Sequence, residues 1–293
     1  MSLKVGIVGA AGYAGAELIR LVLGHPEFEL VAITSNADAG QPLSAVYPSF
    51  AGVSDLVFTT HDAPELKSCD AVFLAVPHTA AMAQVPALLA AGVSCFDLSA
   101  DYRLSDPATF EAWYAAEHTS PELLKTRAFG LPELFCKDLE TAASDHADGK
   151  AVLVACAGCY PTATSLAAAP AVRAGWIAQS GPVIVDAISG VTGAGKSCNA
   201  RTHFCSADEN LEAYGVGKHR HTPEIEQILG LTDRVVFTPH LAPLKRGLLS
   251  TVTMPLAQQA LDTLTLEDVV DHYKQFYACL LYTSPSPRDR SLS

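Results

Sequence analysis

The chain has 293 residues, of which 49% are hydrophobic and 17% are charged. This composition is typical of a folded globular protein and excludes an intrinsically disordered one. Its 19 basic and 31 acidic residues give a net charge of −12, which argues against nucleic acid or an anionic membrane surface as the main partner. A small anionic substrate is compatible with this charge if cations are concentrated at one site.

The amino terminus passes directly into an apolar run at residues 5–8 and shows no export signal, which predicts a cytoplasmic protein with reduced cysteines. The uncharged stretch Ala151–Val172 is the one candidate membrane segment. Pro161, Gly158 and its many alanines and threonines fit a buried strand, turn and helix better than a spanning helix. We therefore expect no membrane partner.

The first part of the chain alternates short β-branched runs with helical patterns, which predicts a parallel sheet with right-handed crossovers. Ligands of such sheets gather at the carboxyl ends of the strands. The expected strands are Leu3–Val8, Glu29–Thr34, Ala71–Val76 and Ser94–Leu98, with helices at Ala14–Leu23 and Thr79–Ala91.

A glycine-rich turn follows the first strand with the pattern GxxGxxG, one residue wider than the common dinucleotide fingerprint. Glycines permit a tight turn and close approach of a pyrophosphate, whose charge the N-terminus of the next helix stabilises. The alternative is a tight connection without a ligand, but the place between a first strand and a first helix favours a dinucleotide. The expected contacts are Gly9, Ala11, Gly12, Tyr13 and Gly15.

The end of the second strand bears on which dinucleotide binds. An NAD site usually carries an Asp or Glu here that accepts from the ribose 2′-hydroxyl. The strand instead ends in Thr34, Ser35 and Asn36, whose hydroxyls and amide can donate to a 2′-phosphate. NADP is therefore the predicted cofactor, although no arginine stands beside these residues to pair with the phosphate.

A polar segment at residues 137–150 predicts a surface connection between two domains. It divides the chain into an NADP-binding domain at 1–150 and a catalytic domain at 151–280, which opens with the strand Ala151–Ala155 and an alanine-rich helix ending near Arg173. The predicted fold class is α/β, with a Rossmann-like, doubly wound parallel sheet followed by a second α+β domain.

Cys159 is the candidate nucleophile. Pro161 suits a first helical turn, so Cys159 is expected at a helix N-terminus, whose N–H groups lower a thiol pKa and can hold an oxyanion. The spacing Cys156-x-x-Cys159 also fits half of a zinc site, a redox dithiol or two core thiols, but no suitably spaced second pair follows. A nucleophilic thiol beside a dinucleotide indicates thioester chemistry, in which an acyl phosphate donates the acyl group and the thioester accepts a hydride.

Seven motifs in order resemble those of the N-acetyl-γ-glutamyl-phosphate reductases, a family of the semialdehyde dehydrogenase superfamily, and the resemblance covers about residues 3 to 278. It implies NADPH-dependent reduction of an acyl phosphate in arginine biosynthesis, with a dimer or tetramer formed through the second domain. The motifs are the glycine turn, Ser99–Arg103, Gly158–Thr162, Phe129–Glu133, Ser189–Lys196, Lys218–Ile225 and Pro239–Pro243 with Arg246 and Gly247.

Matching positions imply that Cys159 is the nucleophile and His219 the acid/base. His219 and His221 lie two residues apart and face one side of an extended segment, so a metal pair and exposed polar residues are alternatives; no third ligand is evident. The loop after the strand Val183–Ile188 is expected to contact the nicotinamide end through Ser189, Gly190 and Gly193. Expected substrate contacts are Ser99, Arg103, Lys196 and His221, with Arg201, Lys218 and Arg220 as further available cations.

The end of the chain departs from the family, whose members continue with further strands and a helix. A capping pattern at Thr265–Asp268 predicts a helix that runs to about Ala278. Residues 281–293 are rich in Ser, Pro and Arg and are expected to be a disordered or foreign tail. Three rival readings stay open: an aspartate-semialdehyde dehydrogenase, an inactive nucleotide-binding remnant, and a Cys-His hydrolase.

Overall fold

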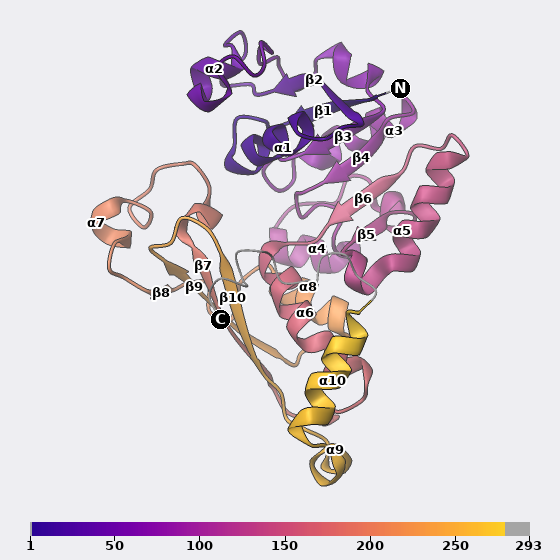
Figure 1. Ribbon diagram of the computed structural model, residues 1–293, viewed down its shortest axis with the longest axis vertical. Coiled ribbons are helices and arrows are strands. Elements are labelled where there is room, and N and C mark those ends of the chain that lie inside the picture. The colour runs from indigo at the N-terminus through magenta and orange to yellow at the C-terminus, as the bar shows by residue number, and fades with distance from the viewer. Residues whose placement is uncertain (1, 279–293) are drawn as a thin grey trace.

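The computed structural model describes residues 2–278, which form two sheets with helices between and around them (Figure 1). The first sheet has six parallel strands in the order β2-β1-β3-β4-β6-β5. The predicted Rossmann-like parallel sheet is confirmed. Its strands are β1 Leu3–Val8, β2 Phe28–Thr34, β3 Ala71–Leu74, β4 Ser94–Asp97, β5 Ala128–Gly130 and β6 Leu153–Cys156.

Helices connect these strands as the sequence pattern predicts. The first crossover helix begins at Tyr13, one residue before its expected start, and the region expected to be helical from residue 79 forms a 3-10 turn followed by a short α-helix. The helices of this part are α1 Tyr13–Leu23, α2 Leu43–Val46, α3 Val85–Ala90, α4 Pro107–Tyr114 and α5 Pro132–Ala147.

One element differs from the expected organisation. Residues 137–150 are not an irregular connection, because most of them form the exposed helix α5, and strand β6 then pairs between β4 and β5 in the first sheet. A polar helix with one buried side chain in sixteen residues has the same polar composition as the surface connection that the sequence predicted. The expected strand at residues 151–155 is present but completes the nucleotide-binding sheet.

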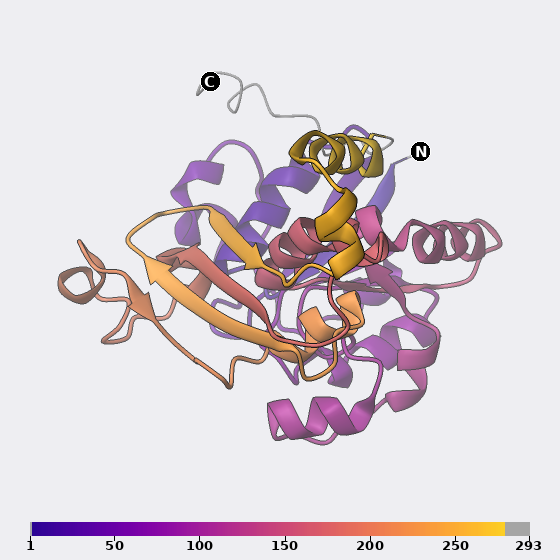
Figure 2. The ribbon, with the colours of Figure 1, turned by 90° about the horizontal axis from the view of Figure 1, so that it is seen from below.

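The second sheet has four strands in the order β10-β7-β9-β8, of which β7 and β9 are parallel and the other pairs antiparallel. In Figure 2, α6 and α10 gather on one side of this sheet. Its strands are β7 Val183–Gly190, β8 Glu212–Ala213, β9 Val235–Ala242 and β10 Leu248–Thr253. Its helices are α6 Cys159–Arg173, α7 Phe204–Ala207, α8 Thr222–Leu229, α9 Gln258–Thr263 and α10 Leu266–Phe276.

Helix α10 begins as the sequence predicts. Thr265 accepts a hydrogen bond from the Asp268 backbone, and the Asp268 side chain accepts from the Thr265 backbone, which forms a capping box. The expected tail at 281–293 lies outside the described residues. Across residues 2–278, no helix is long and apolar enough to cross a membrane.

The junction between the two sheets positions the chemistry. Strand β6 belongs to the first sheet, whereas helix α6, which begins three residues after it ends, packs on α8 and β10 of the second. The turn Ala157–Gly158 therefore joins the two layers at the carboxyl end of a central parallel strand, where ligands of such sheets bind.

Candidate active site

Cys159 is the first residue of α6. Gly158 is the N-cap with φ −67° and ψ 158°, and no side chain caps the helix. The N–H groups of Cys159 and Tyr160 lie within hydrogen-bonding reach of the thiol sulfur. An uncapped helix start at a nucleophile leaves donors that can hold a developing oxyanion.

Cys159 opens into a cavity of about 860 Å³ between the two domains. The walls carry three cations and three histidines but no carboxylate among the described residues. This is the local concentration of positive charge that an anionic substrate needs in a protein of net charge −12. The polar and aromatic lining residues are His78, Tyr114, Cys159, Tyr160, Ser189, Asn199, Arg201, Thr202, Tyr214, Lys218, His219, Arg220 and His221.

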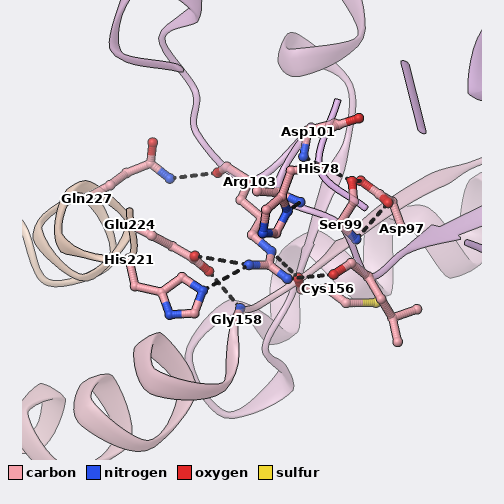
Figure 3. A network of polar contacts seen from close by, with 12 residues as sticks. His78, Asp97, Ser99, Asp101, Arg103, Cys156, Gly158, His221, Glu224 and Gln227 are labelled. Carbon is pink, nitrogen blue, oxygen red and sulfur yellow. Dashed lines mark hydrogen bonds and ion pairs between the residues drawn. The ribbon is translucent and has the colours of Figure 1, made fainter. Parts of the chain in front are cut away.

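Arg103 lies beneath the turn Ala157–Gly158 that leads to Cys159, which we call the elbow. Its side chain does not line this cavity. Its Nε donates to the Cys156 carbonyl at 2.8 Å and its Nη2 to the Leu98 carbonyl at 2.6 Å, while Nη1 faces Glu224 Oε2 at 3.4 Å (Figure 3). The side chain is 5% exposed. Arg103 therefore clamps β4, β6 and α8 together, and its predicted contact with substrate is not supported by this placement.

Glu224 completes the clamp from α8. It is 1% exposed, and its Oε1 accepts the Gly158 N–H at 2.8 Å. Burial raises the Glu224 pKa, while Arg103 and the Gly158 N–H oppose that shift. The charged pair is therefore a fixed support for the backbone residue that precedes the nucleophile.

Ser99 and Asp101 also act inside the protein. The Ser99 hydroxyl donates to Asp97 at 2.9 Å and accepts the Asp101 N–H, so Ser99 does not reach the cavity as expected. The Asp101 carboxylate accepts the N–H groups of Thr79, Ala81 and Met82. Thr79 has φ 74°, a left-handed conformation that these bonds stabilise in a non-glycine residue.

The hydrogen bonds of the histidines assign their neutral tautomers. His219 Nδ1 accepts the backbone N–H of His221 at 3.1 Å, so its Nε2 carries the hydrogen. His221 Nε2 faces the Arg103 guanidinium at 3.5 Å, which can only donate, so the hydrogen is on Nδ1. Among the described residues, Nδ1 of His221 is one of four buried side-chain atoms without a partner. It is an N–H donor available to a ligand.

Burial keeps these histidines neutral. Rings of Tyr160, Tyr214 and Phe237 surround His219 at centroid distances of 5.6, 5.4 and 5.2 Å. This burial, and then Arg220, lower the His219 pKa to about 4. Burial and then Arg103 lower the pKa of His221 well below its ordinary value. Both imidazoles are therefore hydrogen-bond donors rather than cations at neutral pH.

The predicted direction of the Cys159 pKa is wrong. Helix-end N–H groups and Arg103 do lower it, but burial among the walls of the site outweighs them and raises the Cys159 pKa above its ordinary value. Burial raises the pKa of Cys156 to about 12. Cys156 is thus the less reactive of the two, which agrees with the preference for Cys159. Within residues 2–278, no group of three metal-ligating side chains could hold an ion.

The glycine turn fits a dinucleotide. Gly9 has φ 78°, and a Cβ there would lie 2.4 Å from the Ala75 carbonyl oxygen; a Cβ on Gly15 would lie 2.5 Å from the Gly9 oxygen. Gly12 is the N-cap of α1, with no side-chain cap. The backbone beneath the turn is therefore tightly packed, and the N–H groups at the start of α1 are open to a pyrophosphate. The predicted contacts of Ala11 and Tyr13 with the dinucleotide require this arrangement.

The end of β2 is held by its own hydrogen bonds. Thr34 Oγ1 contacts His61 Nδ1 at 2.7 Å, and Asn36 accepts the His61 N–H at 2.9 Å. Ser35 donates to Asp38 at 2.6 Å. An acid therefore does lie close to the strand end, four residues beyond Thr34, where the sequence analysis found none.

Ser189 and Gly193 line the cavity, and their contact with the nicotinamide end of the cofactor stays a prediction. Gly190 instead packs against backbone, since its Cβ would lie 2.6 Å from the Leu244 oxygen. Lys196 reaches across to the first domain, where its Nζ lies 3.4 Å from the Ala11 oxygen and 5.0 Å from the Tyr47 ring centroid. It is placed at the glycine turn rather than in the cavity.

Sequence reasoning missed His78, Tyr114 and Glu224. His78 follows β3, so a polar residue at the carboxyl end of a parallel strand was the available signal. Its Nδ1 accepts the Ala100 N–H at 3.1 Å, and its ring contacts Tyr114 edge-on. Glu224 gave no comparable signal, because an acidic residue in the first turn of a helix usually lies in solvent.

Two family models match successive parts of the chain. The semialdehyde dehydrogenase NAD-binding domain matches residues 4–142, and the semialdehyde dehydrogenase dimerisation domain matches residues 159–284. Relatives named N-acetyl-gamma-glutamyl-phosphate reductase include one from Syntrophobacter fumaroxidans, 47% identical over 94% of this chain and 77% of its own length. Another, from Symbiobacterium thermophilum, is 45% identical over 95% of this chain and 77% of its own length.

Solved structures show the same fold at lower identity. Aspartate semialdehyde dehydrogenase from Candida albicans, with NADP, has a TM-score of 0.69 at 16% identity, covering 93% of this chain and 76% of its own. Aspartate semialdehyde dehydrogenase II from Vibrio cholerae has 0.65 at 15%, covering 94% and 80%. These distant structures show the fold alone, whereas the sequence relatives are 41–48% identical over most of the chain. The chain belongs to the N-acetyl-gamma-glutamyl-phosphate reductase family of the semialdehyde dehydrogenases.

Proposed function

We propose that the chain reduces N-acetyl-L-glutamyl 5-phosphate to N-acetyl-L-glutamate 5-semialdehyde and phosphate, with NADPH as the reductant and Cys159 as the nucleophile. The observation that supports this most is the uncapped start of α6, which presents Cys159 to a cavity lined by cations and neutral histidines. Relatives of this name at 41–48% identity favour this substrate over aspartyl phosphate.

The first half-reaction forms a thioester. Cys159 loses its proton and its sulfur attacks the acyl carbon; the helix-end N–H groups and His221 Nδ1–H hold the oxygen as it becomes negative. The carbon–oxygen bond to phosphate then breaks, and phosphate leaves with the proton that Cys159 gave up. Because the resting thiol has a raised pKa, the main contribution of the elbow is to stabilise the oxyanion of the acyl group rather than the thiolate.

The second half-reaction releases the aldehyde. Bound NADPH supplies the hydride that reduces the thioester carbon. His219 Nε2–H donates to the resulting oxyanion, and its low pKa keeps it a neutral donor rather than a trapped cation. Collapse of the oxyanion expels the Cys159 thiolate, which takes up a proton from solvent and returns to the resting thiol.

We propose NADP rather than NAD on three features of the β2 end. The Asp38 carboxylate accepts from Ser35, so it is engaged within the protein instead of standing free for a ribose 2′-hydroxyl. Ser35 and Asn36 stand at the strand end. Lys67 is exposed and, with His61, lines a cavity of about 330 Å³, where it offers a cation for a 2′-phosphate. The pyrophosphate would lie over the glycine turn, with Lys196 beside Ala11.

We propose a homodimer, or a tetramer built from it, formed through the second sheet. Exposed apolar side chains lie on adjacent strands: Ile184 is 39%, Val236 52% and Leu249 63% exposed. Removal of such a face from water favours association. A charge-introducing Val236→Glu variant should dissociate the oligomer in light scattering. The domain boundary near residue 150 and the cytoplasmic location also stay predictions.

The deciding experiment measures phosphate-dependent NADP⁺ reduction with N-acetylglutamate 5-semialdehyde. The chain should show it, Cys159→Ala should abolish it, and aspartate semialdehyde should be a far poorer substrate. Dinucleotide binding without turnover would favour an inactive remnant, and hydrolysis without dinucleotide binding would favour a Cys-His hydrolase.

A further inference from the structure

His78 is a neutral imidazole that the proposed reaction steps do not use. It follows β3 of the first sheet, and its side chain lines the cavity that holds Cys159. Its Nδ1 accepts the Ala100 N–H at 3.1 Å, so the hydrogen of the neutral ring is on Nε2. Within residues 2–278, this is the only hydrogen bond of the ring. The Nε2–H is therefore a donor available to a ligand.

Burial and neighbouring cations keep this ring uncharged. Burial, then Arg103 and then Arg220 lower the His78 pKa to about 4, and Asp101 opposes them only in part. At neutral pH the Nε2–H therefore requires an acceptor on the ligand, such as a carbonyl oxygen. An ammonium group has no lone pair to accept this hydrogen bond, and the two arginines would repel it.

His78 lies between the elbow and a cation of the second domain. In Figure 3, His78 and His221 both stand beside the Arg103 guanidinium, and His78 is close enough to His221 to lower its pKa. The His78 ring also meets the Tyr114 ring edge-on, at a centroid distance of 5.4 Å. The Arg220 guanidinium carbon lies 5.3 Å from the centroid of that same tyrosine ring. A ligand that begins at the elbow can therefore meet first His78 and then Arg220.

Tyr114 holds the far side of this subsite in place. Its ring stacks on Phe110 at a centroid distance of 4.7 Å and an interplanar angle of 12°, and Phe110 is fully buried in the first domain. A guanidinium over such a fixed ring gains a cation–π contact. Arg220 thus has a defined position although it is exposed.

The end of the proposed substrate that is remote from the acyl phosphate carries a carboxylate and an acetylated amino group. A carboxylate is the natural partner of the Arg220 guanidinium. The acetyl carbonyl oxygen is an acceptor, which the His78 Nε2–H requires. An unacetylated amino group would bring a positive charge to walls whose described residues include no carboxylate.

We propose that His78 is a specificity-determining residue, whose Nε2–H donates to the carbonyl oxygen of the substrate's N-acetyl amide while Arg220 pairs with the adjacent carboxylate. The proposal rests on the proposed function for the identity of the substrate and adds the residue that reads its acetyl group. The donor comes from the first domain, whereas Arg220 and Cys159 come from the second. The acetylated substrate therefore engages both domains at once.

The test compares two aldehydes in phosphate-dependent NADP⁺ reduction. N-acetylglutamate 5-semialdehyde carries the amide, and glutarate semialdehyde has the same carbon chain and carboxylate without it. His78→Leu should reduce the preference for the acetylated aldehyde, as the ratio of the two kcat/KM values, about threefold to tenfold, the worth of one hydrogen bond. Loss of the acceptor for the Ala100 N–H would affect both aldehydes alike and leave this ratio unchanged. His78→Gln keeps a side-chain N–H donor and should restore most of the preference.

Two further variants separate this role from other effects. Arg220→Met should lower kcat/KM for both aldehydes by a similar factor, because both carry the carboxylate, and should leave their ratio unchanged. The matched control is His25→Leu, at an exposed histidine after α1, which should change neither value.

An unchanged ratio in folded His78→Leu, or an effect confined to the KM of NADP⁺, would overturn the inference while the proposed function stands. Absence of turnover in the unmodified chain would instead refute the proposed function. Calorimetric titration with N-acetyl-L-glutamate and with glutarate makes the same comparison without turnover. The first ligand should bind more tightly to the unmodified chain, and His78→Leu should remove most of that difference.

Discussion

The elbow before Cys159 offers the sharpest test of the site, through Gly158→Ala. The backbone at Gly158 has φ −67° and ψ 158°, which alanine adopts without strain. The added methyl group, however, would lie 2.7 Å from His221 Nε2, 2.8 Å from Arg103 Nη1 and 3.1 Å from Glu224 Oε2. The whole effect is therefore steric and falls on the buried support of the elbow.

Two of the three neighbours cannot withdraw easily. Arg103 is tied to the carbonyls of Cys156 and Leu98, and Glu224 holds the N–H of residue 158 itself. Overpacking of this kind costs about 1–3 kcal/mol of unfolding free energy, and separation of the Arg103–Glu224 pair would bring the loss to about 3–5 kcal/mol. If the elbow shifts and the Arg103–Glu224 pair stays intact, we expect the smaller loss of unfolding free energy, about 1–3 kcal/mol.

The catalytic effect should exceed the loss of stability. A shift of about 1 Å at a nucleophile costs on the order of 100-fold in rate, so kcat/KM should fall by about that factor. NADPH affinity should stay within about twofold, because the glycine turn is untouched. The assays are urea unfolding, fluorescence titration with NADPH and steady-state turnover.

The matched control is Gly24→Ala at the end of α1. Its φ is −89°, and a Cβ there would meet the Arg20 oxygen at 3.5 Å and the Leu21 oxygen at 3.7 Å, which are ordinary contacts. It should leave both stability and turnover nearly unchanged. Wild-type kcat/KM in folded Gly158→Ala would refute the view that the Arg103–Glu224 clamp positions the nucleophile.

Three further predictions follow from charge. Alkylation of Cys159 in the protein without ligands, followed by mass spectrometry of its peptide, should accelerate with pH beyond pH 9; a midpoint near 6 would contradict the raised pKa. Arg220→Met should raise the KM of phosphate or of the semialdehyde by roughly tenfold or more, the worth of a charged hydrogen bond, while Lys137→Met on exposed α5 changes neither. The pKa of His219 is about 4 in the folded state against 6.5 in the unfolded chain, so the free energy of unfolding should fall as pH drops from about 6.5 to 4. In urea titrations this fall should be shallower for His219→Asn. An equally steep fall would contradict burial of a neutral imidazole.

The sequence predicted the elements whose periodicity is strong. Strand β1 begins and ends at the expected residues, and the glycine turn, the α6 start and the capping box of α10 were readable because each depends on neighbouring residues alone. The place of β6 was not readable. The residues of a strand do not show which strands it pairs with. The polar segment before β6, which forms helix α5, has the composition of a connection between domains.

The site was predicted by residue type but not by orientation. Arg103 was expected to face the substrate because it follows a strand end. In the fold it turns inward, where the nearby Leu98 carbonyl and two groups from distant segments, the Cys156 carbonyl and the Glu224 carboxylate, engage it. Such convergence depends on contacts 53 to 121 residues apart. The prediction for the Cys159 pKa was wrong for a related reason. The helix start is a local feature of the sequence, whereas burial depends on the whole cavity.

The motif Ser99–Arg103 gains a different meaning from this placement. Asp101 fixes the loop that carries His78 after β3, and Arg103 fixes the carboxyl ends of β4 and β6 against Glu224 of α8. One five-residue segment thus sets the positions of His78, Gly158 and, through Arg103, the tautomer of His221. The charged groups of Asp101 and Arg103 are engaged inside the protein and hold the walls of the site. The cations on the cavity surface that can meet the anion are Arg220, Lys218 and Arg201. A protein of net charge −12 can accept an acyl phosphate here because Asp101 and Glu224 are internal and hydrogen-bonded, and Glu212 pairs with Arg201, whereas Lys218 and Arg220 line the cavity.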